Sequence, residues 1–355
     1  MAIRVVQWST GNVGRHAIAG IDARPELELV GVWVSSEQKA GHDAGRLAGL
    51  GRDLGVTATA DADALIALRP DCIVHTAMAD NRLPDAVEDL KRFLAAGINV
   101  VSSSPVFLQY PDGVVPPELT DPIRKAAADG GASLWVNGVD PGFANDWLPL
   151  VLTSVSERID EVRCTELLDY STYDSPTVMF DVMGFGKPMD HTPMLLMPGV
   201  LSLAWGSVVR QIAAGLGIEL DELKETVIKL PAPETFEIAS GTIAEGTMAA
   251  LRFEVLGMYR GRPAVVLEHV TRLRPDLGPD WPQPAGQGCY RVQITGEPNY
   301  TVDMQLLGTD GDHNTAGLKA TAMRLVNAVE AVVAAPPGLL TALDLPLVTG
   351  RGLVS

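Results

Sequence analysis

Three small residues near the start of the sequence have the spacing of a phosphate-binding turn. Ser9, Gly11 and Gly14 occupy the positions of a G-x-G-x-x-G pattern, with serine in place of the first glycine. In this pattern the first residue makes a tight turn, the second lets the backbone approach a pyrophosphate, and the third lets a helix pack closely on a strand. The turn follows a β-rich run, 3–8, and opens a helical stretch whose N–H groups would face a phosphate. The sequence therefore predicts a dinucleotide-binding turn, with contacts from Ser9, Thr10, Gly11, Asn12, Val13 and Gly14.

The residues after the second β-rich run, 27–34, bear on which dinucleotide is bound. NAD-binding proteins usually place an acidic residue there for the ribose hydroxyls. Here Ser35 and Ser36 come first and Lys39 follows, and two hydroxyls beside an ammonium suit a 2′-phosphate. Glu37 offers the alternative, an acid for the ribose of NAD. We expect NADP to be preferred, with NAD left open.

Two titratable side chains follow predicted strands, where parallel sheets bind their ligands. His75 ends the run 71–77, and we expect it to contact the nicotinamide or donate a proton; the alternative is a buried core histidine. Asp140, in "VDPGF", is either a general acid/base or the cap of the helix that follows. We predict Asp140 and His75 as the catalytic residues, with one or the other as the proton donor. The same strand ends would place three further residues beside the dinucleotide: Thr76, Ala77 and Ser102.

A mainly apolar group of residues is predicted to hold the substrate. Tyr170 and Tyr173 follow the β-rich run 160–170, and a phenol can hydrogen-bond a carbonyl; ordinary packing at a strand end is the alternative. His191 follows a glycine-rich turn and either faces the substrate or lies in a surface loop. An apolar lining favours an uncharged, hydrophobic carbonyl or imine over an amino acid, whose carboxylate would need an arginine. The predicted pocket comprises Val106, Phe107, Phe143, Asp169, Tyr170, Tyr173 and His191.

Several functional classes are disfavoured. The six histidines are scattered, and the three cysteines lack metal-ligand spacing, so we expect no metal and buried, reduced thiols. The net charge of −17 opposes binding to nucleic acid or to anionic membranes. The most apolar region, 192–217, is broken by proline and glycine and reads as buried helix rather than as a membrane span. We expect a cytoplasmic protein.

The elements that must position these residues differ between the two halves of the chain. Strands alternate with helices up to about residue 139, the pattern of a parallel, doubly wound Rossmann sheet. Beyond that, the runs 160–170, 247–275 and 290–296 suggest a mostly antiparallel sheet packed by helices from 176–217. We therefore predict an α/β fold with a Rossmann domain and a second, α+β domain. The predicted domains are 1–145 for the dinucleotide, 146–310 for the substrate, and 311–355 packing back on the Rossmann domain.

Five collinear segments resemble the dihydrodipicolinate-reductase-like superfamily, in the branch of 2,4-diaminopentanoate dehydrogenase and the native NAD(P)H-dependent amine dehydrogenases. They are "RVVQWSTGNVGRHAI", "GVWVSSEQKAGHDAGRLAGLG", "VDPGFANDWLPLVLT", "DVMGFGKP" and "VVAAPPGLLTALDLPLVTGRG". The resemblance implies a Rossmann domain, a carboxyl-terminal domain that supplies a homodimer contact, and NAD(P)H-dependent reduction of C=O or C=N groups. Amine dehydrogenases of this branch convert a ketone or aldehyde and ammonia into an amine.

The sequence departs from that family at the residue most tied to its chemistry. The amine dehydrogenases carry a glutamate in a T-x-x-G-E-F pattern that is thought to position and deprotonate ammonia, and Val106 falls at its place here. A carboxylate, Asp140, stands instead before "PGF", where the family usually has asparagine or histidine. We therefore expect an oxidoreductase that reduces either the C=N group formed from a hydrophobic ketone or aldehyde and ammonia, by reductive amination, or the C=O group itself. The alternatives are an ammonia-independent carbonyl or imine reductase and a non-catalytic NAD(P)-binding sensor.

Overall fold

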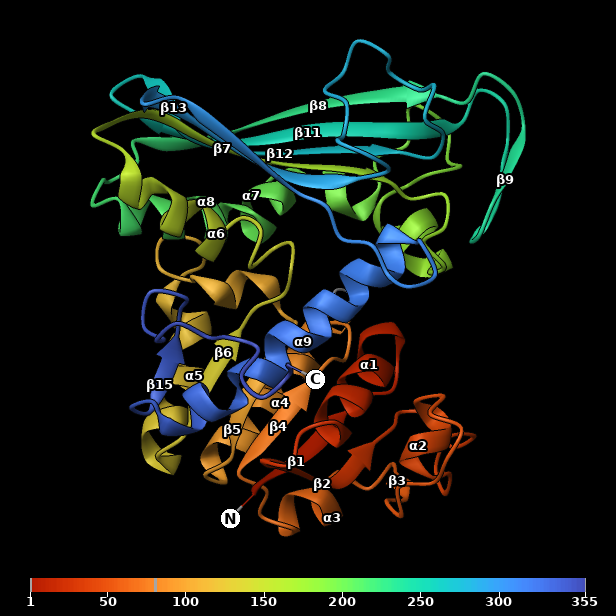
Figure 1. Cartoon of the computed structure of the whole chain (residues 1–355), viewed down its shortest axis with the longest axis vertical. Coiled ribbons are helices and arrows are strands. Elements are labelled where there is room, and N and C mark those ends of the chain that lie inside the picture. Colours follow the sequence, from red (N-terminus) through yellow and green to blue (C-terminus); the bar gives the residue numbers. More distant parts are fainter. Residues whose placement is uncertain (1, 80–81, 355) are drawn as a thin grey trace. The chain divides into compact units, whose positions relative to one another are not determined.

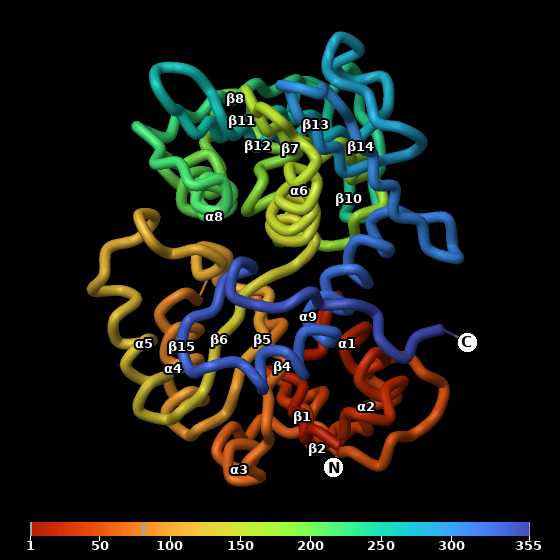
Figure 2. Tube along the Cα trace, turned by 60° about the vertical axis from the view of Figure 1, so that its left-hand side comes forward, coloured from red at the N-terminus to blue at the C-terminus, as the bar shows by residue number. Residues whose placement is uncertain are grey.

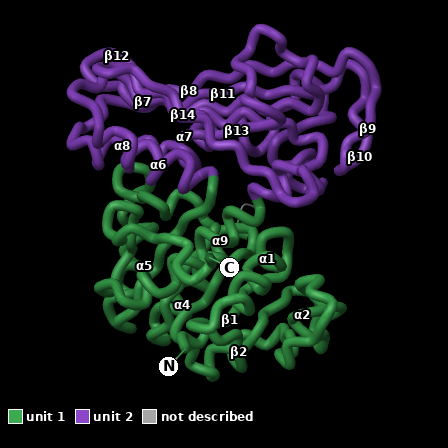
Figure 3. Tube along the Cα trace, viewed as in Figure 1, with its two compact units in different colours: residues 1–139, 318–355 green, residues 140–317 purple. Residues whose placement is uncertain are grey.

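The structure is a computed structural model that describes residues 2–79 and 82–354. The chain divides into two compact units, Met1–Val139 with Leu318–Ser355 and Asp140–Gly317 (Figure 3). The boundaries predicted after residues 145 and 310 therefore differ by a few residues from those of the structure. The second boundary divides one long helix, α9 (His313–Ala334), so that its first turn belongs to unit 2.

Unit 1 contains a sheet of seven strands in the order β15-β6-β5-β4-β1-β2-β3. Every neighbouring pair is parallel, which confirms the predicted Rossmann architecture. The strands are β1 (Ile3–Trp8), β2 (Leu27–Trp33), β3 (Ala58–Thr59), β4 (Cys72–His75), β5 (Asn99–Ser102), β6 (Ser133–Val136) and β15 (Gly338–Leu340).

Helices cover both faces of this sheet. Successive side chains of a strand point to opposite faces, and apolar side chains on both faces are buried against helices. Val5 of β1 packs in one core with Ile21 of α1 and Val329 of α9. Trp8, on the other face of the same strand, meets the ring of Phe93 of α4 edge-on, with 4.6 Å between ring centroids. The helices of unit 1 are α1 (Asn12–Asp22), α2 (Ala44–Leu47), α3 (Ala62–Ala67), α4 (Leu83–Ala95), α5 (Pro117–Gly130) and most of α9.

Unit 2 contains a mixed sheet of six strands in the order β14-β13-β7-β12-β11-β8. Only the pair β12–β7 is parallel, so the sheet is mostly antiparallel, as predicted. A hairpin, β9–β10, forms a separate two-stranded sheet that stands away from the large one in Figure 1. The strands are β7 (Arg158–Asp169), β8 (Glu222–Pro231), β9 (Phe236–Ile238), β10 (Gly241–Ile243), β11 (Met248–Tyr259), β12 (Arg262–Arg272), β13 (Cys289–Glu297) and β14 (Tyr300–Met304).

Three short helices, α6 (Trp147–Leu152), α7 (Val200–Ala204) and α8 (Gly206–Gly215), lie against one face of this sheet (Figure 1), and Figure 2 shows α6 and α8 there from another side. Val209 and Ile212 of α8 pack there with Val162 of β7 and Phe253 of β11. This face therefore carries the main core of unit 2. Among the described residues no helix has both the length and the apolar character needed to cross a membrane, and the apolar region 192–217 forms short helices instead.

Candidate functional site

Four side chains form a row across four neighbouring strands of unit 2. Tyr290 of β13 lies opposite Glu166 of β7, Glu166 lies beside His269 of β12, and His269 lies opposite Phe253 of β11. Residues that pair across strands project from the same face and lie within contact distance. Phe253 belongs to the core beneath α8, so the row lies on the helix-covered face. The sheet register therefore gathers two titratable groups and a phenol that are far apart in the sequence.

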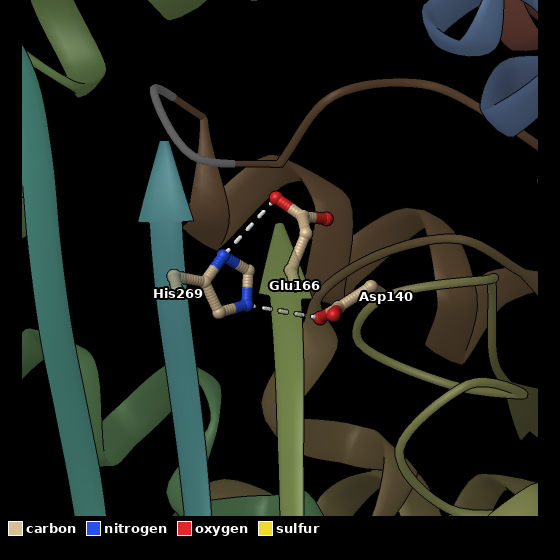
Figure 4. A group of neighbouring side chains, drawn as sticks. All are labelled: Asp140, Glu166 and His269. Carbon is tan, nitrogen blue, oxygen red and sulfur yellow. Dashed lines mark hydrogen bonds and ion pairs between the residues drawn. The ribbon is translucent and has the colours of Figure 1, made fainter. Parts of the chain in front are cut away.

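His269 bridges two carboxylates (Figure 4). Its Nε2 lies 3.2 Å from Oδ1 of Asp140, and its Nδ1 lies 3.3 Å from Oε1 of Glu166. No more than 5% of any of these three side chains is exposed. Burial by itself would lower the pKa of His269, but the two carboxylates outweigh it and raise this pKa to about 10. At neutral pH the ring is therefore an imidazolium that donates to Asp140 and forms an ion pair with Glu166.

Neutral donors and aromatic rings complete the surroundings of this bridge. The indole Nε1 of Trp205 donates to Oδ1 of Asp140 at 2.9 Å, and the phenol of Tyr170 donates to Oε1 of Glu166 at 2.8 Å. The Phe253 ring stacks on the His269 ring at 4.7 Å with 11° between planes, and Trp205 meets it edge-on at 4.7 Å. An aromatic face attracts a cation, so this packing also suits the protonated ring.

The cluster of Asp140, Glu166 and His269 carries an excess of one negative charge when the histidine is protonated. Oδ2 of Asp140 and Oε2 of Glu166 accept no hydrogen bond from the residues that the structure describes. A buried negative charge is costly unless a cation or hydrogen-bond donors compensate it. The cluster is therefore suited to a small cation with N–H groups, such as ammonium or a protonated amine.

The three residues also have the proximity expected of a metal site, with ligand atoms within 4.8 Å of one another. A histidine must be deprotonated on the nitrogen that binds a metal. Here the two ring nitrogens face different carboxylates, which raise the pKa of His269 and so hold a proton on each nitrogen as long as no metal ion displaces it. The arrangement is that of an ion-pair bridge.

Asp140 does not cap the helix that follows, which was the alternative to its predicted catalytic role. The cap of α6 is Asp146, whose side chain accepts a hydrogen bond from the backbone N–H of Trp147. Asp140 lies too early in the chain for that position, and its carboxylate contacts Trp205 and His269 instead.

The glycine turn of unit 1 has the shape needed for a pyrophosphate. Ser9, at the first glycine position, has a φ of +82°, the left-handed conformation that a glycine would adopt easily. A Cβ on Gly14 would lie 2.2 Å from the carbonyl oxygen of Ser9, so only glycine fits there. A Cβ on Gly11 would meet only Oγ of Ser9, at 3.9 Å, and no side chain caps α1 at that residue. The open space and the uncapped helix end fit a bound phosphate.

Two of the other residues predicted to bind the dinucleotide, Lys39 and Thr76, contact this turn or the strand before it. Nζ of Lys39 lies 3.4 Å from both the carbonyl oxygen and the hydroxyl of Thr10, so the loop after β2 reaches back to the turn. The hydroxyl of Thr76 donates to the carbonyl of Trp8, at the end of β1. Ser35 is exposed and Ser36 half-buried, while Ala77 and Ser102 are buried at the ends of β4 and β5.

His75 is fully buried at the end of β4. The Ser102 hydroxyl lies 2.8 Å from Nδ1 of His75 and donates to the carbonyl of Ser104, so it accepts a hydrogen bond from Nδ1–H. Nε2 is then the unprotonated nitrogen, and it has no partner among the described residues. Burial, with a smaller effect of Arg82, lowers the pKa of His75 to about 3. Its role as proton donor stays a prediction, and this tautomer favours accepting a hydrogen bond.

The predicted pocket residues lie in several places. Tyr170 joins the charged cluster, and Tyr173 stacks on it at 5.2 Å between centroids. Phe143 stacks on Trp147 at 5.7 Å. Val106 and Phe107 belong to unit 1, in a 3₁₀ turn, Val106–Gln109, after β5.

Two further predicted residues lie apart from the cluster. His191 is exposed, and its carbonyl accepts a hydrogen bond from Lys229. Asp169 lines a cavity of unit 2, of about 570 Å³, together with Arg272 and His313. The structure thus brings Asp140 and Tyr170 together and leaves these two outside their group.

Glu166, His269, Trp205 and Tyr290 were not predicted from the sequence. One signal was present. Glu166 and His269 each interrupt an apolar strand at a position where its neighbours of the same parity face the core, such as Cys164 and Leu267. A buried polar residue in such a strand indicates either a functional group or a paired charge.

Comparisons with known proteins agree on one family. The family model of the 2,4-diaminopentanoate dehydrogenase C-terminal domain matches residues 143–352. An amine dehydrogenase of Streptomyces virginiae is 44% identical over 97% of this chain and 96% of its own length. The 2,4-diaminopentanoate dehydrogenase of Acetoanaerobium sticklandii is 23% identical over 74% of this chain and 70% of its own.

The fold is also that of a solved relative. The structure of the amine dehydrogenase from Mycobacterium smegmatis superposes with a TM-score of 0.79 at 24% identity, covering 99% of this chain and 98% of that one. The glycine turn, the two kinds of sheet and the full-length likeness lead to the same assignment. The chain belongs to the amine dehydrogenase and 2,4-diaminopentanoate dehydrogenase family and is an NAD(P)-dependent oxidoreductase.

Proposed function

We propose that this protein interconverts a hydrophobic ketone or aldehyde plus ammonia with the corresponding primary amine, using NADP(H) in preference to NAD(H). The observation that carries the proposal is the buried cluster of Asp140, Glu166 and His269 with its excess negative charge. This charge favours an ammonium ion or a protonated amine over a neutral ligand. It also opposes a substrate carboxylate, which supports a simple carbonyl compound over a keto acid.

Asp140 is the residue to which we assign the transfer of the nitrogen proton. Its Oδ1 is held by Trp205 and His269, which leaves Oδ2 to accept a proton from ammonium and release ammonia. Glu166 accepts a second N–H of the same ion through Oε2. The nicotinamide, when bound, supplies or accepts the hydride. In this assignment Asp140 takes the place of the family glutamate that Val106 replaces.

The substitution Asp140→Asn tests the proposal. NADPH consumption is measured with a panel of hydrophobic ketones and aldehydes, each with and without ammonium. We expect turnover of the wild type to require ammonium, and kcat to fall about 100-fold or more in the variant. The dissociation constant for NADPH, measured by fluorescence, should be unchanged. Asp190→Asn, at an exposed residue of unit 2, is the matched control.

Other outcomes identify the alternatives. Turnover by the wild type without ammonium would indicate a carbonyl reductase. Tight NADPH binding with no turnover across the panel would favour a cofactor-binding sensor. An Asp140→Asn variant as active as the wild type would contradict the assignment of Asp140.

A further inference from the structure

Tyr290 is the titratable member of the row across the sheet that the proposed function does not use. It lies directly opposite Glu166, in register on the neighbouring antiparallel strand. Only 5% of the residue is exposed. Its hydroxyl nevertheless makes no hydrogen bond to the residues that the structure describes. The oxygen is not among the fully buried atoms without a partner, so the hydroxyl retains some accessible surface through which a ligand atom could reach it.

The surroundings keep this phenol protonated. Burial raises the pKa of Tyr290 well above its usual value, and the nearby charges of Glu166 and Asp140 add to the effect, as does Tyr173. The other phenol beside Glu166, that of Tyr170, already donates to this carboxylate. Tyr290 is therefore a neutral O–H donor beside the negatively charged cluster.

Space remains beside the hydroxyl. Gly317, in the first turns of α9, carries no side chain, and a Cβ there would lie 3.4 Å from the Tyr290 oxygen. Both residues belong to unit 2. An atom of a ligand could therefore approach the hydroxyl from the side of Gly317.

We propose that Tyr290 is the general acid of the reaction, donating its hydroxyl proton to the oxygen that leaves the substrate as water. This inference rests on the proposed function. After ammonia has added to the carbonyl, the carbinolamine must break its C–O bond while the nitrogen lone pair forms the C=N bond. The oxygen leaves as water when it gains the Tyr290 proton, and an iminium ion remains to receive the hydride.

The proton transfers in these reaction steps balance. Asp140 takes one proton from ammonium when it releases ammonia, and this proton returns to the Tyr290 phenolate after water has left. The sum is a carbonyl compound, ammonium and NADPH giving an amine, water and NADP⁺. The base and the acid therefore exchange a single proton in each turnover, and neither needs another co-reactant.

The substitution Tyr290→Phe removes the hydroxyl and keeps the ring. We expect kcat/KM for the ketone, at saturating ammonium and NADPH, to fall about 100-fold. The ratio of the variant rate to the wild-type rate should rise as the pH falls, because hydronium ion replaces the lost donor. Tyr259→Phe, at a half-buried tyrosine of β11 outside the row, is the matched control and should retain the wild-type rate.

A second variant tests the open space. Gly317→Ala places a methyl group in van der Waals contact with the hydroxyl and, inside a helix, should hold or raise the free energy of unfolding. We expect its kcat/KM to fall at least threefold although the fold is not weakened. A kcat/KM of Tyr290→Phe within twofold of the wild type would overturn this inference and leave the proposed function standing. So would a lower kcat/KM whose ratio to the wild-type value does not change with pH. Absence of ammonium-dependent turnover in the wild type would overturn the proposed function as well.

Discussion

Lys39 is the charged side chain that bears most directly on the choice of dinucleotide. Its ammonium reaches Thr10 in the glycine turn from a loop that also contains Ser35, Ser36 and Glu37. If it contacts a 2′-phosphate, Lys39→Ala should weaken NADPH binding about 10-fold, the value of one charge-assisted contact, and leave NADH binding within twofold. Fluorescence titration of both reduced cofactors measures this.

Glu37, in the same loop as Lys39, allows a negative charge to be removed instead of a positive one. Glu37→Gln should leave NADPH binding intact or tighten it, because it removes a negative charge near the phosphate. Equal weakening of NADPH and NADH by Lys39→Ala would instead assign the lysine to the pyrophosphate, which both cofactors share.

Only one residue of the charged cluster could be assigned a role from the sequence. Asp140 could be found because it stands beside a recognisable motif and because a carboxylate was missing at Val106. Glu166 and His269 could not be assigned a role, because their proximity depends on the register between β7 and β12. Register is decided by the packing of the whole sheet and not by local sequence.

At the scale of elements, the β1–turn–α1 segment contains a strained residue and an essential glycine. A non-glycine residue in the left-handed region costs about 1 kcal/mol, so Ser9→Gly should raise the free energy of unfolding by about that amount. Gly14→Ala should lower it, because the new methyl group collides with the carbonyl of Ser9. Urea denaturation measures both effects, and NADPH titration shows whether the turn still binds. A less stable Ser9→Gly variant would show that the serine hydroxyl matters more than the backbone strain.

The elements themselves were predictable where their patterns were long and periodic. The runs 3–8 and 160–170 correspond to β1 and β7. β8 was missed because its side chains are mostly exposed, as expected for an edge strand without apolar alternation. β15 has three residues, too few for a pattern, and it is a strand only because it pairs with β6.

At the scale of the whole molecule, each unit contains a buried histidine whose pKa is shifted, in opposite directions in the two units. His75 in unit 1 has a folded-state pKa of about 3, well below the 6.5 of an unfolded chain, because burial disfavours its charged form. His269 in unit 2 has a pKa of about 10, because Asp140 and Glu166 outweigh the effect of burial. One ring is held neutral and the other charged.

These two histidines should make the units lose stability at opposite ends of the pH range. The contribution of His75 is present above pH 6.5 and is lost as the pH falls toward 3, since the unfolded chain then binds the extra proton. That of His269 is fully present below 6.5 and is lost as the pH rises through 10. Each effect is on the order of 1 kcal/mol per pH unit within its window. The protein is incubated at a series of pH values and then labelled with deuterium in a short pulse at one common pH. Mass spectrometry of its peptides then measures the opening of each unit separately.

Substitutions of His75 and His269 test whether these two rings cause the pH dependence of stability. We expect acid to open the strands of unit 1 first and alkali those of unit 2 first. His75→Gln should flatten the acid dependence of unit 1, and His269→Gln the alkaline dependence of unit 2. His42→Gln, at an exposed histidine of unit 1, should change neither slope. If alkali opened unit 2 to the same extent with and without His269, the imidazolium bridge would not be what stabilises the site.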